Sequence, residues 1–389
     1  MEAYVGMDVH CKESVYVIQD GTGRVIGEGQ VPTSWMGMLE FQERHGVAPG
    51  TKVALETGSV SFYVARLLMR LGLVPVVVDA HEVRLKAHRP NQKSDRRDAF
   101  ELCEGLRRDI YRVIVHIPPP EVQQLREALA RRRHFVQICT REVVSAKHLL
   151  RAEGLVELTG HLRSEPAWSR LVERLDFAPD LQVLIDCHRT AWLCAQAQVR
   201  RIEQHIGQIR TAHTASVTAL QAIPGVGPIV AQTVVAAVSD PERFPTAKHV
   251  ASFAGLVPST HQSGERNHQG RITKRGSPEL RAMLCEAAHH ASRPEHPLNP
   301  YFAKLCARRG YRMAVVAVAH RLLRIMWAMM RSGTDFDVGR LGVEAGPFEV
   351  TVKRPYRLKK TRALAKAGPG RTAKTRSSTG TMIVPRAAV

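Results

Sequence analysis

Ala3-Tyr4-Val5-Gly6-Met7-Asp8-Val9 and Lys52-Val53-Ala54-Leu55-Glu56 decide the fold of the first part of this chain. Each stretch is short and apolar, which predicts a buried strand. Each also carries an acid at or near its end. If the two strands are neighbours in one sheet, their acids meet at one edge, so the fold and a candidate site depend on the same two stretches.

Strand and helix patterns alternate around these stretches, which is typical of an α/β domain. The first three strands are close enough in sequence to form an antiparallel meander, with a turn at Gly21-Thr22-Gly23. Ser94 is suited to cap a helix that begins after it. The other expected elements are strands at 14–18, 25–31 and 74–78 and helices at 35–44, 59–71 and from Ser94 onward.

Beyond this α/β part the pattern becomes helical. Apolar residues follow the three-four-three spacing of a coiled-coil seam at Val199, Ile202, Ile206 and Ile209. We therefore expect a long helical arm, interrupted near residues 154–166, that serves as a spacer or as a dimerisation element. The predicted division is an α/β domain at 1–118, a helical arm at 119–210, a mostly helical domain at 211–335 and a basic, disordered tail at 336–389.

The charge of the chain points to its partner. Lysine and arginine total 56 against 36 acidic residues, a net charge of +20. Such an excess favours binding to nucleic acid, because neutralising phosphates releases counterions. Part of the excess lies in the tail, and the rest of the chain is still basic. The tail residues proposed to bind nucleic acid are Lys353, Arg354, Lys359 and Lys360.

Other function classes fit the sequence less well. The seven cysteines are scattered without a C-x-x-C pair, so neither a disulfide framework nor a zinc site is expected. The apolar run at 313–330 is interrupted by His320, Arg321 and Arg324, which argues against a membrane span. The N-terminus lacks the pattern of a signal peptide. A cytoplasmic protein that acts at the nucleoid is expected.

Four acids form the candidate catalytic and metal-binding set. Asp8 and Glu56 end predicted strands, and Asp95 and Asp98 lie three apart at the start of a predicted helix. A buried cluster of carboxylates is costly unless a cation offsets the repulsion. Mg²⁺ prefers oxygen ligands, and two such ions about 4 Å apart stabilise the attacking and leaving oxygens of phosphoryl transfer. The alternative for residues 95–98 is a salt-bridged surface turn.

Three motifs together resemble a known family. They are Gly6-Met7-Asp8-Val9-His10, Leu55-Glu56-Thr57-Gly58 and Lys93-Ser94-Asp95-Arg96-Arg97-Asp98-Ala99. They are similar to the DEDD transposases of the insertion-sequence 110 family, relatives of the Piv and MooV invertases. The resemblance implies an RNase H-like, RuvC-like fold for the N-terminal domain. It also implies that Asp8, Glu56, Asp95 and Asp98 bind the metal.

The second domain contains a short DNA-binding pattern. Ile223-Pro224-Gly225-Val226-Gly227-Pro228 resembles a helix-hairpin-helix, in which Gly225 and Gly227 permit a tight turn. Backbone N–H groups at the start of the following helix then bind a DNA phosphate. A plain helical hairpin is the alternative.

A serine among basic residues follows this motif. Ser263 lies in a glycine-containing loop, and a free serine needs a base or a metal to become a nucleophile. From chemistry alone, capping or phosphate binding is favoured over nucleophilic attack. The resemblance extends here and implies that Ser263 attacks the DNA backbone, with Ser259 and Ser277 as lesser candidates. The basic residues expected to bind nucleic acid here are Arg266, Arg271, Lys274 and Arg275.

The resemblance thus implies a transposase that recombines DNA through a phosphoserine intermediate. The resemblance also implies a structured guide RNA, the bridge RNA of some relatives. Exchange between two DNA partners favours an even-numbered homo-oligomer, a dimer or a tetramer. Two alternatives stay open: a RuvC-like junction resolvase in which water attacks, and a non-catalytic nucleic-acid-binding scaffold.

Overall fold

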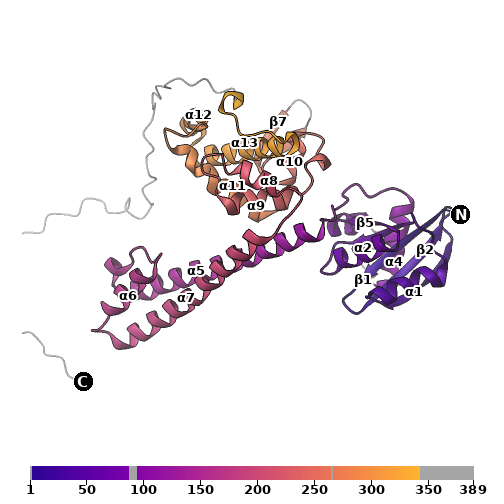
Figure 1. Cartoon of the computed structure of the whole chain (residues 1–389), viewed down its shortest axis with the longest axis horizontal. Helices are drawn as coiled ribbons and strands as arrows, with labels where there is room; N and C mark the ends of the chain where they lie inside the picture. The colour runs from indigo at the N-terminus through magenta and orange to yellow at the C-terminus, as the bar shows by residue number, and fades with distance from the viewer. Residues whose placement is uncertain (1, 87–93, 264–265, 342–389) are drawn as a thin grey trace, which may run out of the picture.

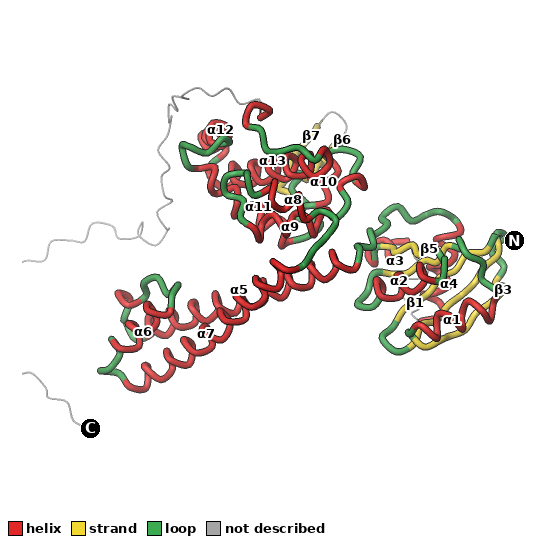
Figure 2. The backbone as a smooth tube through the Cα atoms, in the orientation of Figure 1, coloured by secondary structure: helices red, strands yellow, loops and turns green. Residues whose placement is uncertain are grey.

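A computed structural model describes residues 2–86, 94–263 and 266–341. The described chain forms an N-terminal α/β body, a long helical hairpin and a C-terminal body (Figure 1). Figure 2 shows that the strands gather in the N-terminal body, apart from a short β-hairpin in the otherwise helical C-terminal body.

A mixed five-stranded sheet in the order β3-β2-β1-β4-β5 forms the centre of the N-terminal body. The first three strands pair antiparallel, as predicted for a meander, whereas β4 pairs parallel with both β1 and β5. The first and fourth strands are therefore neighbours, as the sequence predicted. The strands are β1 (Ala3–Val9), β2 (Glu13–Asp20), β3 (Val25–Pro32), β4 (Lys52–Glu56) and β5 (Val74–Val78).

Helices cover both faces of this sheet. Val5 and Met7 are fully buried on the face covered by α1 and α2, and the intervening Gly6 faces α4 on the other side. The short α3 after β5 was not among the predicted elements. The helices are α1 (Trp35–His45), α2 (Ser61–Arg70), α3 (Ala80–Lys86) and α4 (Asp95–Arg107).

The arm is an antiparallel pair of long helices, α5 (Pro120–Ala152) and α7 (Pro179–Gln208). Arg132 Nε lies 2.7 Å from Glu203 Oε1 across the pair. Of the predicted seam, Val199 and Ile206 are buried and Ile202 is partly buried. The fourth seam residue, Ile209, follows the end of α7 and still packs, partly buried, against the same cluster as Ile206.

The tip of the arm has a core of its own. The predicted interruption is present after α5, where the chain forms the 3₁₀ helix η1 (Val156–Leu158) and then α6 (Glu165–Glu173). Trp168 is fully buried there, and its ring centroid lies 6.1 Å from that of Trp192 on α7. The arm therefore ends in a small helical knob (Figure 1).

The C-terminal body packs short helices around the long helix α13. By length and composition alone α13 could cross a membrane, with a mean hydropathy of 1.5 over its most apolar 18 residues. Within the body it is a core helix, because Leu322, Leu323 and Met326 are fully buried. The elements are α8 (Thr214–Leu220), α9 (Pro228–Val238), η2 (Pro241–Arg243), α10 (Ala247–Phe253), β6 (Pro258–Ser263), β7 (Arg266–Ile272), α11 (Pro278–His289), η3 (His290–Ser292), α12 (Asn299–Arg309), α13 (Tyr311–Ser332) and η4 (Val338–Leu341).

A cavity of about 650 Å³ lies where the three bodies join, lined by the 113–116 linker, α5, α9 and the start of α11. Its two arginines already have partners, because Arg126 Nε donates to Ala236 O at 2.8 Å and Arg243 Nε to Val238 O at 2.9 Å. Burial, aided by the charge of Arg126, lowers the pKa of Arg243 to about 10. These arginines satisfy the carbonyls at the end of α9, so we interpret the cavity as a structural joint.

Candidate active site

Two neighbouring strands place the first pair of acids. Met7 of β1 is in parallel register with Leu55 of β4, so Asp8 and Glu56 are the next residues along the two strands. Because side chains alternate and Met7 and Leu55 belong to the core under α1 and α2, the two acids belong to the opposite face. That is the face covered by α4.

Helix α4 brings the second pair of acids to the same place. Ser94 caps it, since its side chain accepts a hydrogen bond from Arg97 N at 3.4 Å. Asp95 and Asp98 occupy the first turn. Asp98 is one turn before the buried Leu102, so its side chain shares the helix stripe that faces the sheet.

Gly6 allows α4 to lie directly on β1. A Cβ added at Gly6 would lie 2.1 Å from Ala99 O and 2.3 Å from Cys103 N, both in the backbone of α4. The Cys103 thiol also donates to Tyr4 O at 3.2 Å, and burial raises its pKa to about 12. The close contact between this strand and this helix is what sets Asp95 and Asp98 over the end of β1.

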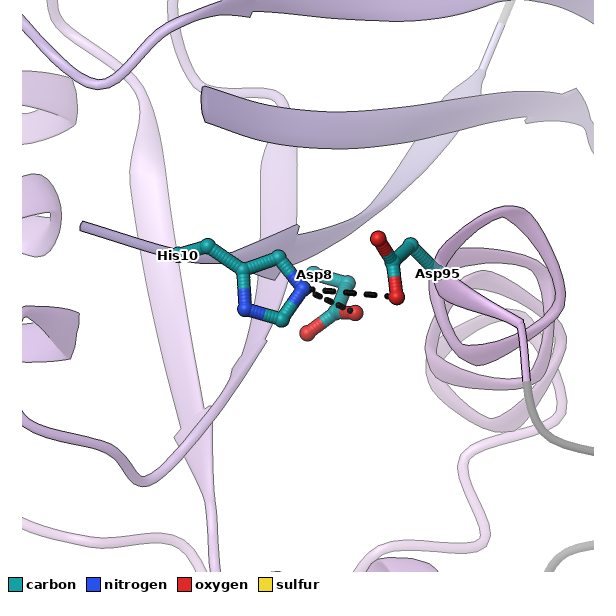
Figure 3. A group of neighbouring side chains, drawn as sticks. All are labelled: Asp8, His10 and Asp95. Carbon is teal, nitrogen blue, oxygen red and sulfur yellow. Dashed lines mark ion pairs between the residues drawn. The ribbon is translucent and has the colours of Figure 1, made fainter. Parts of the chain in front are cut away.

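His10 is a further residue of this site. It lies in the Gly6-Met7-Asp8-Val9-His10 motif but was not among the predicted site residues. His10 Nε2 lies 3.1 Å from Asp8 Oδ2 and 3.5 Å from Asp95 Oδ1, so one ring nitrogen bridges a strand acid and a helix acid (Figure 3). The signal was available, because alternation along an extended strand places residues two apart on one face.

The basic residues between the helix acids have partners on α4 and β3. Arg96 donates to Glu28 Oε2 from Nε at 3.1 Å and from Nη2 at 2.7 Å, which ties α4 to β3. Arg97 Nη2 lies 3.7 Å from Glu101 Oε1, one turn along the helix. Residues 95–98 form the first turn of α4 and not an isolated surface turn, and the ion pairs of Arg96 and Arg97 run to β3 and along α4.

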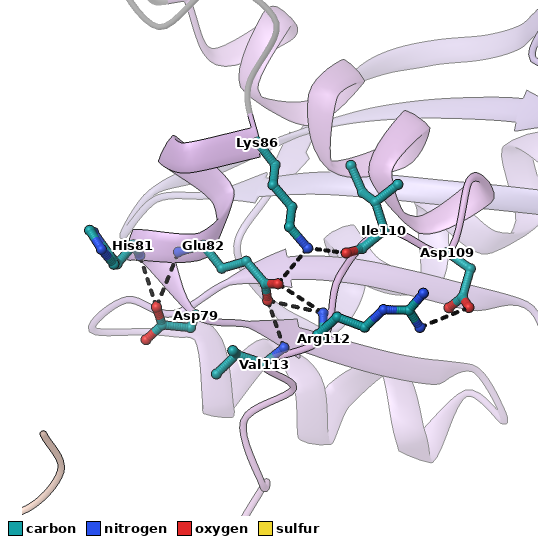
Figure 4. A network of polar contacts seen from close by, with 8 residues as sticks. All are labelled: Asp79, His81, Glu82, Lys86, Asp109, Ile110, Arg112 and Val113. Atoms are coloured by element: carbon teal, nitrogen blue, oxygen red, sulfur yellow. Dashed lines mark hydrogen bonds and ion pairs between the residues drawn. The ribbon is translucent and has the colours of Figure 1, made fainter. Parts of the chain in front are cut away.

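Another acidic residue of the N-terminal body, Glu82, has a structural role that the sequence analysis did not predict (Figure 4). Glu82 of α3 is buried, and its carboxylate accepts from Lys86 Nζ at 2.6 Å, Arg112 N at 2.9 Å and Val113 N at 2.6 Å. Burial alone would raise the pKa of Glu82, but these hydrogen bonds outweigh it and lower the pKa. The network fixes the start of the linker that leads to the arm.

The residues brought together suit a divalent cation. Asp8, His10 and Asp95 offer ligand atoms that all lie within 4.8 Å of one another. Asp8 is mostly buried, with 15% of its side chain exposed, whereas Asp95 is 58% exposed. The site therefore has a fixed inner carboxylate and an outer one open to solvent, and Glu56 and Asp98 belong to the same face. Carboxylate oxygens of this kind are preferred by Mg²⁺, Mn²⁺ and Ca²⁺.

Ser263 belongs to a different body from these acids. It ends β6, and its backbone is in register with Arg266 at the start of β7. The sequence predicted a loop here, and the structure instead has a β-hairpin, because 258–263 and 266–272 pair antiparallel. Residues 264–265 lie outside the described residues.

The other predicted basic residues divide into two groups. Arg271, Lys274 and Arg275 are exposed at the end of β7 and just after it. The tail residues Lys353, Arg354, Lys359 and Lys360 lie outside the described residues. Of the two lesser serines, Ser277 caps α11, since its Oγ accepts from Leu280 N at 3.2 Å.

The predicted helix-hairpin-helix pattern lies in the turn between α8 and α9. Gly225 has a φ of +83°, which favours glycine, and an added Cβ would lie 2.7 Å from His290 Cβ. Gly227 precedes α9 without a side-chain cap, and an added Cβ there would meet nothing within 4 Å. Gly227 and Pro228 are exposed, so the start of α9 is open to solvent, but its first residue, Pro228, has no N–H to donate to a phosphate.

Two family models match this chain, one over the N-terminal body and α5 and the other over most of the C-terminal body. One, described as a transposase and specific to the DEDD domain of IS110 elements, matches residues 5–153, which contain all four acids. The other, described as "Transposase IS116/IS110/IS902 family", matches residues 217–303, which contain the α8–α9 turn and the β6–β7 hairpin. The chain belongs to the IS110/IS116/IS902 family of transposases. It is an enzyme of DNA transposition with an RNase H-like DEDD nuclease domain, and it binds DNA.

Curated relatives agree with this membership. A "Probable family 20 transposase" of Pseudomonas aeruginosa is 28% identical over 75% of this chain and 87% of that protein. The transposase of insertion sequence element IS1111A of Coxiella burnetii is 27% identical over 70% of this chain and 76% of its own length. A pilin gene-inverting protein of Moraxella bovis is 36% identical, over 32% of this chain and 39% of that protein. The DEDD domain of this transposase implies a divalent metal, and the acids described above would hold it.

Proposed function

We propose that this transposase cuts and rejoins DNA through a covalent phosphoserine intermediate, with Ser263 as the nucleophile and Mg²⁺ held by Asp8, Glu56, Asp95 and Asp98. The observation that carries the metal half of the proposal is the meeting of the strand acids and the helix acids on the α4 face of the sheet. The ion, or a pair of ions, would supply charge stabilisation at the scissile phosphate.

The serine half rests on the placement of the β6–β7 hairpin. Ser263 forms the last described backbone pair before the hairpin turn. The exposed Arg271 lies near the end of β7, and the exposed Lys274 and Arg275 follow the strand. Positive charge of this kind attracts the DNA backbone to the hairpin. Ser263 Oγ forms the new bond to phosphorus, the bond from phosphorus to the leaving sugar oxygen breaks, and the serine proton leaves for a base or solvent. The ester keeps the bond energy, so a hydroxyl of another strand can reverse the step without ATP.

Assembly of the complete site requires two bodies that are joined by α5 (Figure 1). The four acids lie in the N-terminal body, and Ser263 lies in the C-terminal body. We infer a homo-oligomer, a dimer or a tetramer, in which the acids of one subunit act with Ser263 of another. The arm supports this inference, because Val144, Val183 and Leu184 are large apolar residues exposed on α5 and α7.

The basic tail and the remaining basic surface suit a structured RNA that selects the DNA sites by base pairing. The net charge of +20 supports binding of nucleic acid without distinguishing DNA from RNA. We therefore propose a bridge RNA as a partner and the bacterial nucleoid as the place of action.

Water in place of Ser263 would make the chain a RuvC-like nuclease such as a junction resolvase. That second candidate has a specific observation in its favour, since all four acids belong to the N-terminal body and Ser263 does not. The two candidates differ in what the loss of the serine hydroxyl does.

The test is excision in cells that carry the gene with its flanking DNA. The circular junction of the excised element is amplified for the unmodified chain, Asp98→Asn, Ser263→Ala and Ser259→Ala. We expect Asp98→Asn and Ser263→Ala to lose the junction and Ser259→Ala, a serine of the same strand, to retain it. Circles formed by Ser263→Ala would refute the serine mechanism and favour water as the nucleophile.

A further inference from the structure

His10 is held in place at the edge of the metal site. It follows the last residue of β1, and its backbone N–H donates to Glu13 O at 3.1 Å. Its carbonyl accepts from Thr33 Oγ1 at 2.7 Å. The backbone of His10 is therefore bonded both to the start of β2 and to Thr33, the residue after β3, so the ring projects from a fixed point next to Asp8.

The ring nitrogen stands at coordination spacing from two carboxylates. Its distances of 3.1 Å to Asp8 Oδ2 and 3.5 Å to Asp95 Oδ1 can be compared with an octahedral ion whose ligands lie at about 2.1 Å. Neighbouring ligands of such an ion are about 3 Å apart. The imidazole nitrogen thus lies from each carboxylate at nearly the separation of two ligands that share one cation, and the ligand atoms of the three residues all lie within 4.8 Å of one another (Figure 3).

The surroundings allow a cation to reach this point. The His10 ring is 52% exposed and the Asp95 side chain is 58% exposed, so an ion can enter from solvent. Asp8, at 15% exposed, forms the inner wall. If the imidazole only paired with the carboxylates, the ring would have to move aside when the ion binds. If the imidazole nitrogen coordinates the ion, the ring needs only a small change of position.

We propose that His10 is a nitrogen ligand of the divalent ion, together with Asp8 and Asp95. Mg²⁺ prefers oxygen ligands, whereas an imidazole contributes more to a transition-metal ion. The site therefore binds Mn²⁺ more tightly than Mg²⁺. The inference rests on the metal site of the DEDD domain and is independent of the identity of the nucleophile.

The test uses Mn²⁺ alone, added to the full chain without nucleic acid. Electron spin-echo spectroscopy detects nitrogen coupled to bound Mn²⁺, and titration gives the dissociation constants for Mn²⁺ and Mg²⁺. The variants are His10→Gln and, as a matched control, His81→Gln, because His81 is also an exposed histidine of the N-terminal body. A second sample of the unmodified chain carries ¹⁵N-labelled histidine.

We expect nitrogen coupling in the unmodified chain and in His81→Gln, a changed pattern with ¹⁵N-histidine, and no coupling in His10→Gln. His10→Gln should weaken Mn²⁺ binding by about tenfold or more and Mg²⁺ binding by less. Bound Mn²⁺ without histidine coupling in the unmodified chain would overturn the proposal, and so would unchanged coupling in His10→Gln. Either result would leave the serine mechanism standing, because excision by Ser263→Ala tests that mechanism separately.

Discussion

Substituting Gly6 should separate the two halves of the metal site without removing any ligand. In Gly6→Ala the new Cβ would lie 2.1 Å from Ala99 O, whereas ordinary contacts begin at 3.4 Å. Helix α4 would have to move away from β1 by roughly 1.3 Å, because the neighbouring atoms are backbone and cannot rotate aside. Asp95 and Asp98 would move with the helix.

The size of the effect follows from two general costs. Overpacking a core lowers the free energy of unfolding by about 1–3 kcal/mol. A misplacement of about 1 Å in a catalytic constellation lowers the rate by about 100-fold. Gly6→Ala should therefore remain folded at moderate temperature and lose most of its excision activity, with weakened binding of Mn²⁺.

The assay compares Gly6→Ala with Gly21→Ala, since an added Cβ at Gly21 meets nothing within 4 Å. Chemical denaturation gives the loss of stability, Mn²⁺ titration reports the metal site, and the circular junction reports excision. Gly21→Ala should resemble the unmodified chain in all three. The reasoning would be refuted if Gly6→Ala kept normal Mn²⁺ affinity and normal excision, because the position of α4 would then not depend on this contact.

Three further predictions concern stability. Glu82→Gln should lower the free energy of unfolding by about 1–3 kcal/mol, because it removes the negative charge to which Lys86 Nζ and two backbone N–H groups donate hydrogen bonds. A normal denaturation midpoint for Glu82→Gln would contradict this. Trp168→Ala should cost about 3–5 kcal/mol and speed hydrogen exchange at the tip of the arm while leaving the N-terminal sheet protected; uniform exchange would argue against a separate core. Burial lowers the pKa of four histidines, so the unfolded chain binds protons first as the pH falls below about 6.5, and the free energy of unfolding should fall between pH 7.5 and pH 5.5. A flat profile over that range would contradict the burial of His45, His116, His296 and His320.

The N-terminal sheet was predictable because its strands carry a local signal. Apolar runs of the right length predicted all five strands, and the short connections within the first three predicted their antiparallel pairing. The helix α3 was missed because its seven residues are too few to show a period. The β6–β7 hairpin was missed for a related reason, since 258–272 is polar and glycine-containing and suggested a loop.

Contacts over long sequence distances were beyond the reach of pattern alone. Nothing in the local sequence of Glu82 indicated that Arg112 and Val113 would donate to it across thirty residues. His10 could have been selected from its spacing to Asp8, but its approach to Asp95 depends on how α4 lies on the sheet.

The sequence by itself determined the family and the α/β class of the N-terminal domain, and it predicted the four candidate acids, because strand ends, a helix cap and the three motifs are all local patterns. Only the tertiary structure decided which groups meet. The contact between Gly6 and the backbone of α4 sets Asp95 beside Asp8 and His10, and the α5 arm places Ser263 on a separate body. The physical reason is that the spacing of apolar residues along a helix or strand specifies which of its faces is buried. Which residues lie opposite that face depends on how two buried faces pack together.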